Sequence, residues 1–383
     1  MMERRKNLND KFGFVDSMKI KDFIDYEQPN EYIVESDRYN IKYSTPVLTA
    51  GQSFILGYTN ESKGIYKKGP CIIFDDFTTS VHYVDFLFKV KSSAMKILTT
   101  KSNTDLKYCY YLLLSLSKMP PNHKRQWIST TSEKSYVLPS MDKQISIVKQ
   151  LDLISDTIAN YTNQIENLDN LVKARFIEMF GDPIVNEKGW RTKPLLDMGQ
   201  CKNGMNFHYD DKGIDINCLG VCDFKNFSVI DNTKGLPTVS LNEMPSEEYL
   251  LKDDDIVFVR SNGNKTLVGR SLVVYPGNVP TTFSGFCIRY RNYDNEIIVP
   301  YLLRVLKTDS VRMKMAGRGA NIQNLNQQIL GTLVIPVPPI ELQQQFADFV
   351  EQVDKSRETV KKSLEKTQQL YDSLMQEYFG QDR

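Results

Sequence analysis

Histidine is scarce in this sequence, which has only three among 383 residues: His82, His123 and His208. With so few histidines, a site that uses imidazole as a general base or as a metal ligand is not expected. Long hydrophobic runs are also missing. No stretch of about 18 apolar residues occurs, so the sequence predicts no membrane-spanning helix. The opening residues MMERRKNLNDKFGF lack the apolar centre of a secretory signal.

Cysteine is sparse as well. The six cysteines are scattered along a chain long enough to bury its own core: Cys71, Cys109, Cys201, Cys218, Cys222 and Cys287. Such scattering is typical of reduced thiols in a cytoplasm rather than of a disulfide framework. Only Cys218 and Cys222 lie close together, and because no second pair follows, we expect no bound metal.

Motifs for catalysis are missing too. An amino-methyltransferase needs an NPPY-type or DPPF-type loop, and the two Pro-Pro sites, MPPN (119–122) and PVPPI (336–340), do not fit. The segment SNGNKTLVG contains Lys265 and Thr266 but lacks the upstream glycine spacing of a phosphate-binding loop. No convincing carboxylate pair for a Mg²⁺-dependent nuclease occurs. The sequence therefore predicts a chain with no catalytic residues, no metal and no cofactor of its own.

What the sequence does contain is an internal repeat. Residues 139–181 align without a gap on residues 338–380, at a shift of 199 positions, with seven identical pairs. The identities include the proline and glutamine at the start of each copy and the Phe-Gly at its end, in FIEMFGD (176–182) and MQEYFGQ (375–381). We expect each phenylalanine to pack against the last helical turn, and each glycine to end its helix in the left-handed conformation.

Both copies predict long helices with a coiled-coil seam. Apolar residues recur in alternating steps of four and three, with Arg357 and Thr367 as polar interruptions that can fix the register. The other copy can pair with each seam without a second chain, so we expect the two helices of one chain to pair with each other. The seam residues of the first copy are Ile147, Leu151, Ile154, Ile158, Tyr161, Ile165, Leu168 and Val172, and those of the second are Phe346, Val350, Val353, Val360, Leu364 and Tyr371.

The blocks before the two helices, 1–138 and 183–337, share a plan. Both are rich in β-branched and aromatic residues with frequent turn signals. Several segments correspond in order. These are the openings 18–24 and 192–199, the strands 67–76 and 251–260, the short helices 104–116 and 297–309, the basic loops 120–130 and 316–327, and the closing strands 135–140 and 332–338.

Five segments are informative in combination. They are TPVLTAGQSFILGYTNESKGIY (45–66), IIFDDFTTSVHYVDFLFKVKSSAMKIL (72–98), LDNLVKARFIEMFGDP (168–183), FVRSNGNKTLVGRS (258–271) and the Pro-x-x-x-x-Gln start of each long helix. Together they make the chain resemble the specificity subunits of type I restriction–modification systems, over nearly its whole length.

The resemblance implies an α+β fold. Two target-recognition domains, 1–138 and 183–337, are separated by two long helices, 139–182 and 338–383, which form an intramolecular antiparallel coiled coil. It also implies a non-catalytic subunit that reads an asymmetric bipartite DNA site with a fixed unread spacer. The implied partners are double-stranded DNA, two methyltransferase subunits and motor–nuclease restriction subunits, in the cytoplasm and away from membranes. S-adenosylmethionine is then expected in the methyltransferase, and ATP and Mg in the restriction subunit.

Candidate DNA contacts lie in the loops. Net charge is only +1, so DNA binding must come from local patches. Arg, Lys and His suit phosphates, while Arg, Asn and Gln can read base edges. Asp75 and Asp76 are possible acceptors from cytosine. The candidates are Thr78, Thr79, His82, His123, Lys124, Arg125, Arg260, Asn262, Asn264, Lys265, Arg270, Arg312, Lys314, Arg318, Asn321 and Gln323.

Three other functions remain open from the sequence. The chain could be a coiled-coil scaffold without DNA readout, which the basic loops of both blocks argue against. It could be the specificity part of another multisubunit DNA methyltransferase. It could also be a self-sufficient modification enzyme, against which the missing methyl-donor motifs argue.

Overall fold

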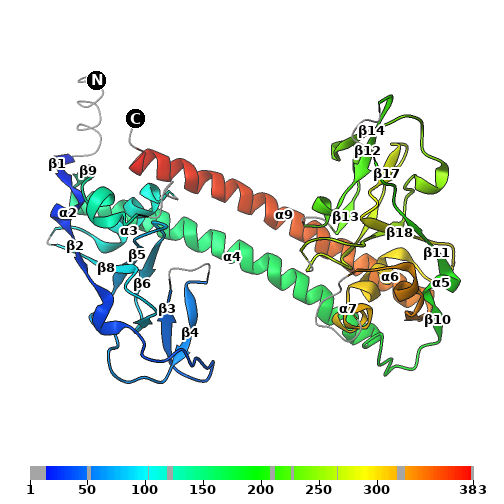
Figure 1. The fold of residues 1–383 in the computed structure, drawn as a ribbon, viewed down its shortest axis with the longest axis horizontal. Coiled ribbons are helices and arrows are strands. Elements are labelled where there is room, and N and C mark those ends of the chain that lie inside the picture. Colours follow the sequence, from blue (N-terminus) through cyan, green and yellow to red (C-terminus); the bar gives the residue numbers. More distant parts are fainter. Residues whose placement is uncertain are drawn as a thin grey trace. The chain divides into compact units, whose positions relative to one another are not determined.

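The computed structural model describes residues 14–49, 53–101, 103–118, 124–207, 212–225, 228–264, 266–316 and 324–380. The chain divides into two compact units (Figure 1). The first unit comprises Met1–Asn163 and Lys361–Arg383, and the second comprises Gln164–Val360. Each unit therefore contains one of the two sequence blocks together with part of both long helices. None of the helices in the described ranges is long and apolar enough to cross a membrane.

The first unit contains a four-stranded and a three-stranded sheet, in addition to a pair of strands at its opening and close. The larger is antiparallel throughout, in the order β2-β8-β5-β6, and the smaller has the order β4-β3-β7 with β3 and β7 parallel. Alternating turn signals and β-branched residues account for such short strands. Their bounds are β2 Ile24–Glu27, β3 Thr45–Leu48, β4 Ile55–Thr59, β5 Cys71–Asp75, β6 Val81–Val84, β7 Lys89–Val90 and β8 Met95–Thr100.

The second unit repeats this topology. Its larger sheet has the order β11-β18-β15-β16-β13, and its smaller sheet the order β14-β12-β17 with β12 and β17 parallel. The correspondence confirms the predicted repeat of the two blocks, with β13 as an addition. The bounds are β11 Gly199–Asn203, β12 Ile214–Leu219, β13 Val229–Ile230, β14 Thr238–Leu241, β15 Asp255–Val259, β16 Ser271–Val274, β17 Thr281–Phe283 and β18 Cys287–Asn292.

Each block also opens and closes in the same way. Its first strand pairs antiparallel with the strand that leads into a long helix: β1 (Phe14–Lys19) with β9 (Ser135–Pro139), and β10 (Thr192–Pro194) with β19 (Val334–Pro336). The corresponding short helices are α2 Ile20–Phe23 and α5 Leu195–Met198, then α3 Leu106–Leu116 and α6 Val299–Lys307.

The two blocks differ after α3 and α6. The first block has a π-helical turn at Trp127–Thr131, whereas the second has two helices, α7 (Asp309–Ala316) and α8 (Gln327–Gly331). Short 3₁₀ turns complete the described structure, at Pro29–Tyr32, Val221–Lys225, Thr233–Gly235 and Glu247–Tyr249.

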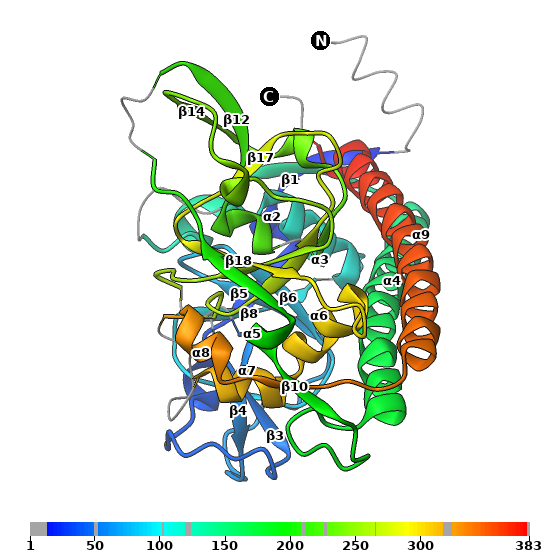
Figure 2. The ribbon, with the colours of Figure 1, turned by 90° about the vertical axis from the view of Figure 1, so that its right-hand side faces the viewer.

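The predicted long helices are present as α4 (Met141–Phe180) and α9 (Ile340–Phe379), each of 40 residues. In the first unit the start of α4 contacts the end of α9, where the Tyr378 hydroxyl donates to Gln150 Oε1 at 2.8 Å. In the second unit the end of α4 contacts the start of α9, where the rings of Phe176 and Phe346 lie 5.5 Å apart. The pairing is therefore antiparallel, and α4 and α9 lie side by side in Figure 2.

Burial along the helix seam is uneven. Near the helix starts, Ile147, Leu151, Phe346 and Val353 are fully buried because the blocks also pack against them. Two helices alone cannot enclose a seam, so most of its other predicted residues are only half-buried: Ile154, Ile158, Tyr161, Ile165, Leu168, Val350, Val360, Leu364 and Tyr371. Val172 is the exception, because it is buried in the core of the second unit.

The helix ends explain the repeated Phe-Gly. Phe180, at the end of α4, packs its ring 4.7 Å from Tyr301 of α6 in the second unit. Phe379, at the end of α9, packs 5.3 Å from the equivalent Tyr108 of α3 in the first unit. Each helix thus starts in its own block and ends against the other.

The glycines that follow behave differently from one another. Gly181 has the predicted left-handed backbone, with φ of 75°. For Gly380 the prediction is wrong, because its φ lies outside that region. A Cβ at Gly380 would instead lie 2.3 Å from the carbonyl oxygen of Gln376, so glycine is needed there for close approach of the backbone.

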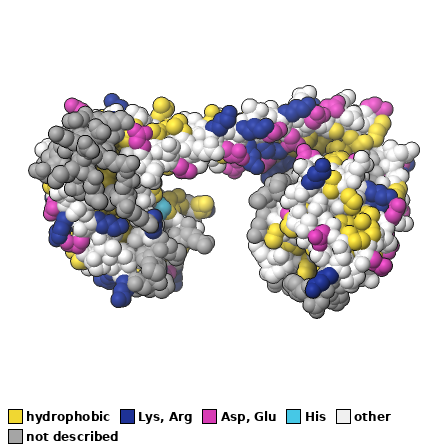
Figure 3. All heavy atoms as spheres, turned by 90° about the horizontal axis from the view of Figure 1, so that it is seen from above, with side chains coloured by type: hydrophobic (Ala, Val, Ile, Leu, Met, Phe, Trp, Pro, Cys, Tyr) yellow, Lys and Arg dark blue, Asp and Glu magenta, His cyan; other side chains and the backbone are white. Residues whose placement is uncertain are grey.

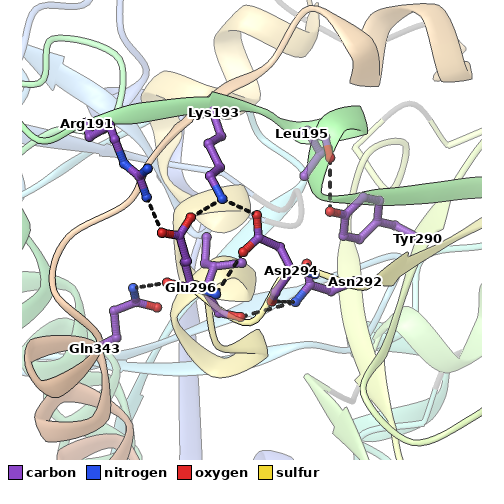
Figure 4. A network of polar contacts seen from close by, with 9 residues as sticks. Arg191, Lys193, Leu195, Tyr290, Asn292, Asp294, Glu296 and Gln343 are labelled. Atoms are coloured by element: carbon purple, nitrogen blue, oxygen red, sulfur yellow. Dashed lines mark hydrogen bonds and ion pairs between the residues drawn. The ribbon is translucent and has the colours of Figure 1, made fainter.

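A buried glutamine fixes each helix start. Gln343 is fully buried, and its Nε2 donates to the carbonyl oxygen of Glu296 (Figure 4). The same Nε2 donates to the Pro338 carbonyl oxygen, and Oε1 accepts from the amide of Ile298, which precedes α6. Gln144 does the same in the first unit, with the Pro139 carbonyl and the Asp105 amide. The Pro-x-x-x-x-Gln motif therefore joins each long helix to the N-terminus of its block's short helix.

Candidate nucleic-acid interface

Two candidate loops meet in the first unit. The turn after β5 begins at Asp76, whose carbonyl oxygen accepts from the amide of Gln126 at 2.8 Å. The Asp76 carboxylate accepts from the amides of Gln126 and Trp127 as well, at 3.0 and 2.8 Å. Exposed Lys124 and Arg125 stand directly before this anchor. The predicted β5–β6 turn and the predicted basic loop are therefore one surface.

The second unit repeats this junction. Arg260, at the position equivalent to Asp76, accepts from the amide of Leu325 at 2.8 Å through its carbonyl oxygen. A single backbone hydrogen bond thus ties the loop after the central strand to the segment before the long helix in both units. Sequence reasoning missed this connection, and only the matched order of the segments pointed toward it.

The two aspartates at the end of β5 are turned inward, which corrects the prediction that they accept from cytosine. Asp75 is buried, and its Oδ1 accepts from the amides of Phe77 and Thr78 at 2.7 and 3.1 Å. Asp76 is fully buried, and its Oδ2 lies 3.1 Å from the equally buried ammonium of Lys96. A buried carboxylate must be paired or hydrogen-bonded, and these carboxylates are held inside the protein for that reason.

Thr79 also has an internal role. It is buried with φ of 60°, its hydroxyl donates to the carbonyl oxygen of Lys118 at 2.9 Å, and it accepts from the Lys118 amide at 3.1 Å. The hydroxyl therefore closes the loop that follows α3 and is not available to DNA. Thr78 is half-buried and bonds to its neighbour Ser80 through its hydroxyl at 3.2 Å.

His82 lies on β6 against an aromatic ring. Its imidazole stacks on Phe54, with ring centroids 3.8 Å apart and an interplanar angle of 14°. Burial lowers the pKa of His82, with nearby Asp75 opposing the shift. The ring is therefore neutral near pH 7, which suits a hydrogen bond to a base edge better than a charged contact to a phosphate.

The loop after β15 is shaped by its own asparagines. Asn262 Oδ1 accepts from the amide of Asn264 at 2.7 Å, and Asn264 Oδ1 accepts from the amide and hydroxyl of Thr266 at 3.1 and 2.9 Å. Such turns hold the backbone while leaving the amide nitrogens of the side chains free to donate. Arg260 and Asn264 are exposed at this loop.

Arg312 of α7 binds the backbone at the end of the same loop. Arg312 donates to the carbonyl oxygens of Gly269 and Val268, at 2.9 and 3.3 Å. Burial, and next the charge of Arg270, lowers the pKa of its guanidinium. The structure thus gives Arg312 a positioning role in place of the predicted DNA contact. Arg270 is half-buried, with a long 3.5 Å contact to the carbonyl of Phe224, and Lys314 is exposed.

Five candidates lie outside the described residues: His123, Lys265, Arg318, Asn321 and Gln323. Among the described candidates, the exposed cations and amide are Lys124, Arg125, Arg260, Asn264 and Lys314. Apart from Lys314, which lies on α7, they lie around the two equivalent junctions, and they differ in kind. The first unit presents a Lys-Arg pair before the junction at Asp76 and a histidine on β6, and the second presents an arginine beside asparagine turns.

Comparisons with known proteins agree with this architecture. The sequence profile of the type I restriction modification DNA specificity domain matches residues 187–369. The EcoR124I/EcoR124II specificity subunit of Escherichia coli is 30% identical over 372 residues, which cover 91% of this chain and 89% of that protein. The StySPI specificity subunit of Salmonella potsdam is 25% identical over 62% of this chain and 54% of its own length.

Solved structures share the fold as well. The S subunit of a type I restriction–modification system from M. genitalium aligns with a TM-score of 0.61 at 17% identity, over 98% of both chains. A chain from a structure of type I system assembly aligns with a TM-score of 0.51 at 14% identity, over 94% of this chain and 98% of that one. With two β-rich domains and two long helices in contact, the chain belongs to the family of type I restriction–modification specificity subunits, the non-catalytic subunits that give these systems their DNA specificity.

Proposed function

We propose that the chain reads an asymmetric bipartite DNA site, with one half-site for each unit and an unread spacer of fixed length between them. The observation that carries the proposal is the pair of equivalent junctions at Asp76 and Arg260. They have the same backbone connection and different side chains around it. Two modules with one plan and two sets of reading groups favour two different half-sites.

The exposed side chains suit this division of work. Arginine and asparagine make bidentate contacts to guanine and adenine edges, so Arg260 and Asn264 are reading groups for the second half-site. Lys124 and Arg125 are exposed next to the first junction and supply phosphate contacts there, and the ring of His82 on β6 supplies a contact to a base edge. Arg318, Asn321 and Gln323 remain proposed readers on sequence grounds.

The chain is further proposed to assemble with two methyltransferase subunits, and with motor–nuclease restriction subunits in the complete system. Apolar side chains are exposed at equivalent places on both helices, which supports two equivalent docking surfaces. Met141 and Ile340 are 37% and 38% exposed, and Leu171 and Leu370 are 48% and 51% exposed. S-adenosylmethionine, ATP and Mg then belong to those partners.

An exchange of reading loops tests the proposal. Replacing residues 261–264 by the equivalent loop of another specificity subunit should change the methylated sequence in one half-site only, as measured by methylome sequencing of cells that carry the system. A corresponding exchange of residues 77–82, which include His82, should change the other half-site only. If either exchange altered both half-sites, the proposal of one module for each half-site would be wrong.

A further inference from the structure

A charged cluster lies where α6 faces the long helices of the second unit. Arg304 and Lys307 stand on the last turn of α6, and Arg357 stands on α9. Arg357 bridges two carboxylates, with Nη2 2.6 Å from Asp169 of α4 and Nη1 paired to Asp354 of its own helix. Lys and Arg side chains gather over the helices beside the second domain in Figure 3.

The charges of this cluster do not balance. Three cations face two carboxylates, and Arg357 is paired with both. In the described part of the chain, Arg304 and Lys307 have no hydrogen bond or ion pair with a carboxylate, and the Nε of Arg357 is buried without a partner. One positive charge is therefore left over, together with a free N–H group.

Partial burial makes this surplus charge costly. Burial, and next the charge of Arg304, lowers the pKa of Lys307 to about 8. Burial also lowers the pKa of the Arg304 guanidinium. A cation held partly out of water without a counter-ion favours the binding of an anion, which would restore its charge and replace its lost hydration.

The first unit shows that the fold does not need these charges. The glutamine contacts align Asp105 with Ile298, and the helices align at a shift of 199. At the five positions equivalent to the cluster the first unit has no formal charge: Tyr111, Leu114, Ser155, Ile158 and Gln368. The Tyr111 hydroxyl instead bonds to Asp152 of α4 at 2.7 Å.

The helix dipole does not account for the cluster either. Cations near a helix C-terminus are stabilised by the unpaired carbonyl groups, and Arg304 and Lys307 have that position in α6. The equivalent helix α3, however, ends without any basic residue. The dipole therefore tolerates these cations but does not require them.

We propose that Arg304, Lys307 and Arg357 form an anion site that holds one backbone phosphate of the bound DNA. The inference rests on the proposed function and adds a contact outside the reading loops. If the anion belonged to a protein partner bound in two copies, one on each unit, both units should carry equivalent cations. The first unit has no formal charge at these positions. A duplex with two different half-sites is asymmetric, and α7, with exposed Lys314, follows directly from α6 toward the loops around Arg260.

The site couples DNA binding to protonation. The charged groups that face Lys307 are Arg304 on its own helix, Asp354 and Arg357 on α9, and Asp169 on α4. A phosphate binds the protonated ammonium. The contribution of Lys307 to affinity should therefore be present at pH 7 and should fall about tenfold between roughly pH 7 and pH 9 as the free amine forms.

Substitutions that install the first unit's residues provide the test. The double variant Arg304→Tyr, Lys307→Leu matches Tyr111 and Leu114, which the fold already accommodates. In the complete complex with the methyltransferase, binding to a duplex that carries the methylated site should lose about one unit of salt slope, with base preference unchanged. Lys307→Arg should keep the slope and lose the pH dependence. Lys149→Leu, which removes an exposed cation of α4 in the first unit, is the control and should change neither.

The outcomes are distinct. An unchanged salt slope and pH profile in the double variant, with normal assembly and base preference, would overturn the phosphate site and leave the proposed function intact. Loss of bound methyltransferase by light scattering, with the salt slope per assembled complex unchanged, would make the cluster a protein-docking site and also overturn the proposal. Failure of the wild-type complex to prefer any duplex would contradict the proposed function itself.

Discussion

At the scale of single residues, the buried glutamine side chain at the start of each long helix holds that helix to its block. Gln343 satisfies two carbonyl oxygens and one amide that no regular element would satisfy. The Glu296 carbonyl oxygen accepts from Gln343, and the Glu296 carboxylate is paired with Arg191 at 2.7 Å and with Lys193 (Figure 4). A polar network of this kind is stabilising only while every member is satisfied.

Gln343→Ala should therefore be costly. The substitution leaves buried polar groups without partners, at about 1–3 kcal/mol for each. We expect a lower midpoint of urea unfolding and faster hydrogen exchange at the amide of Ile298. Gln344→Ala is the matched control, because the Gln344 side chain is exposed and bonds to the exposed Asp348 one turn away. Equal effects of the two substitutions would show that the buried network does not hold the helix start.

At the scale of elements, each long helix belongs to both units. Phe180 lies at the end of the helix that starts in the first unit, yet it is buried against Tyr301 and Phe346 in the second. Phe379 is buried in the first unit although α9 starts in the second. Large aromatic side chains at the end of a helix are efficient anchors because they bury much area with few rotatable bonds.

Phe180→Ala should destabilise the second unit, against which α4 ends, and not the first unit, in which α4 starts. Truncating a buried phenylalanine costs about 3–5 kcal/mol. We expect hydrogen exchange to increase in α6 and β19, while α3 and β9 keep their protection, and Phe379→Ala should show the reverse pattern. If Phe180→Ala increased hydrogen exchange mainly in α3, the conclusion that the end of α4 is anchored in the second unit would be wrong.

At the scale of the whole molecule, the helices are proposed to set the distance between half-sites. Seven residues inserted into α4 after Asn163, and seven into α9 after Val360, preserve the phase of the seam and add about 10 Å, or roughly three base pairs. Methylome sequencing should show a longer unread spacer and the same half-site bases. A change of bases within the half-sites would refute the helices as spacers. The same insertion in α4 alone is the control and should abolish modification, because the two seams no longer match.

Much of the architecture followed from the sequence alone. Helices and short strands are set by local periodicity and turn residues, which is why the long helices and the closing strands were predicted close to their observed bounds. The repeat added the equivalence of the two halves. Absent motifs, together with the family resemblance, indicated a non-catalytic subunit that recognises DNA.

The tertiary structure decided how each polar side chain is used. Asp76, Thr79 and Arg312 lie in segments whose sequence indicates DNA binding, yet each bonds to a group 39 to 51 residues away in the chain. The cluster around Lys307 combines residues from three helices that no local pattern joins. A polar side chain is free for a ligand only when no partner in the fold has taken it, and that partner is brought near by long-range packing, which local sequence does not encode.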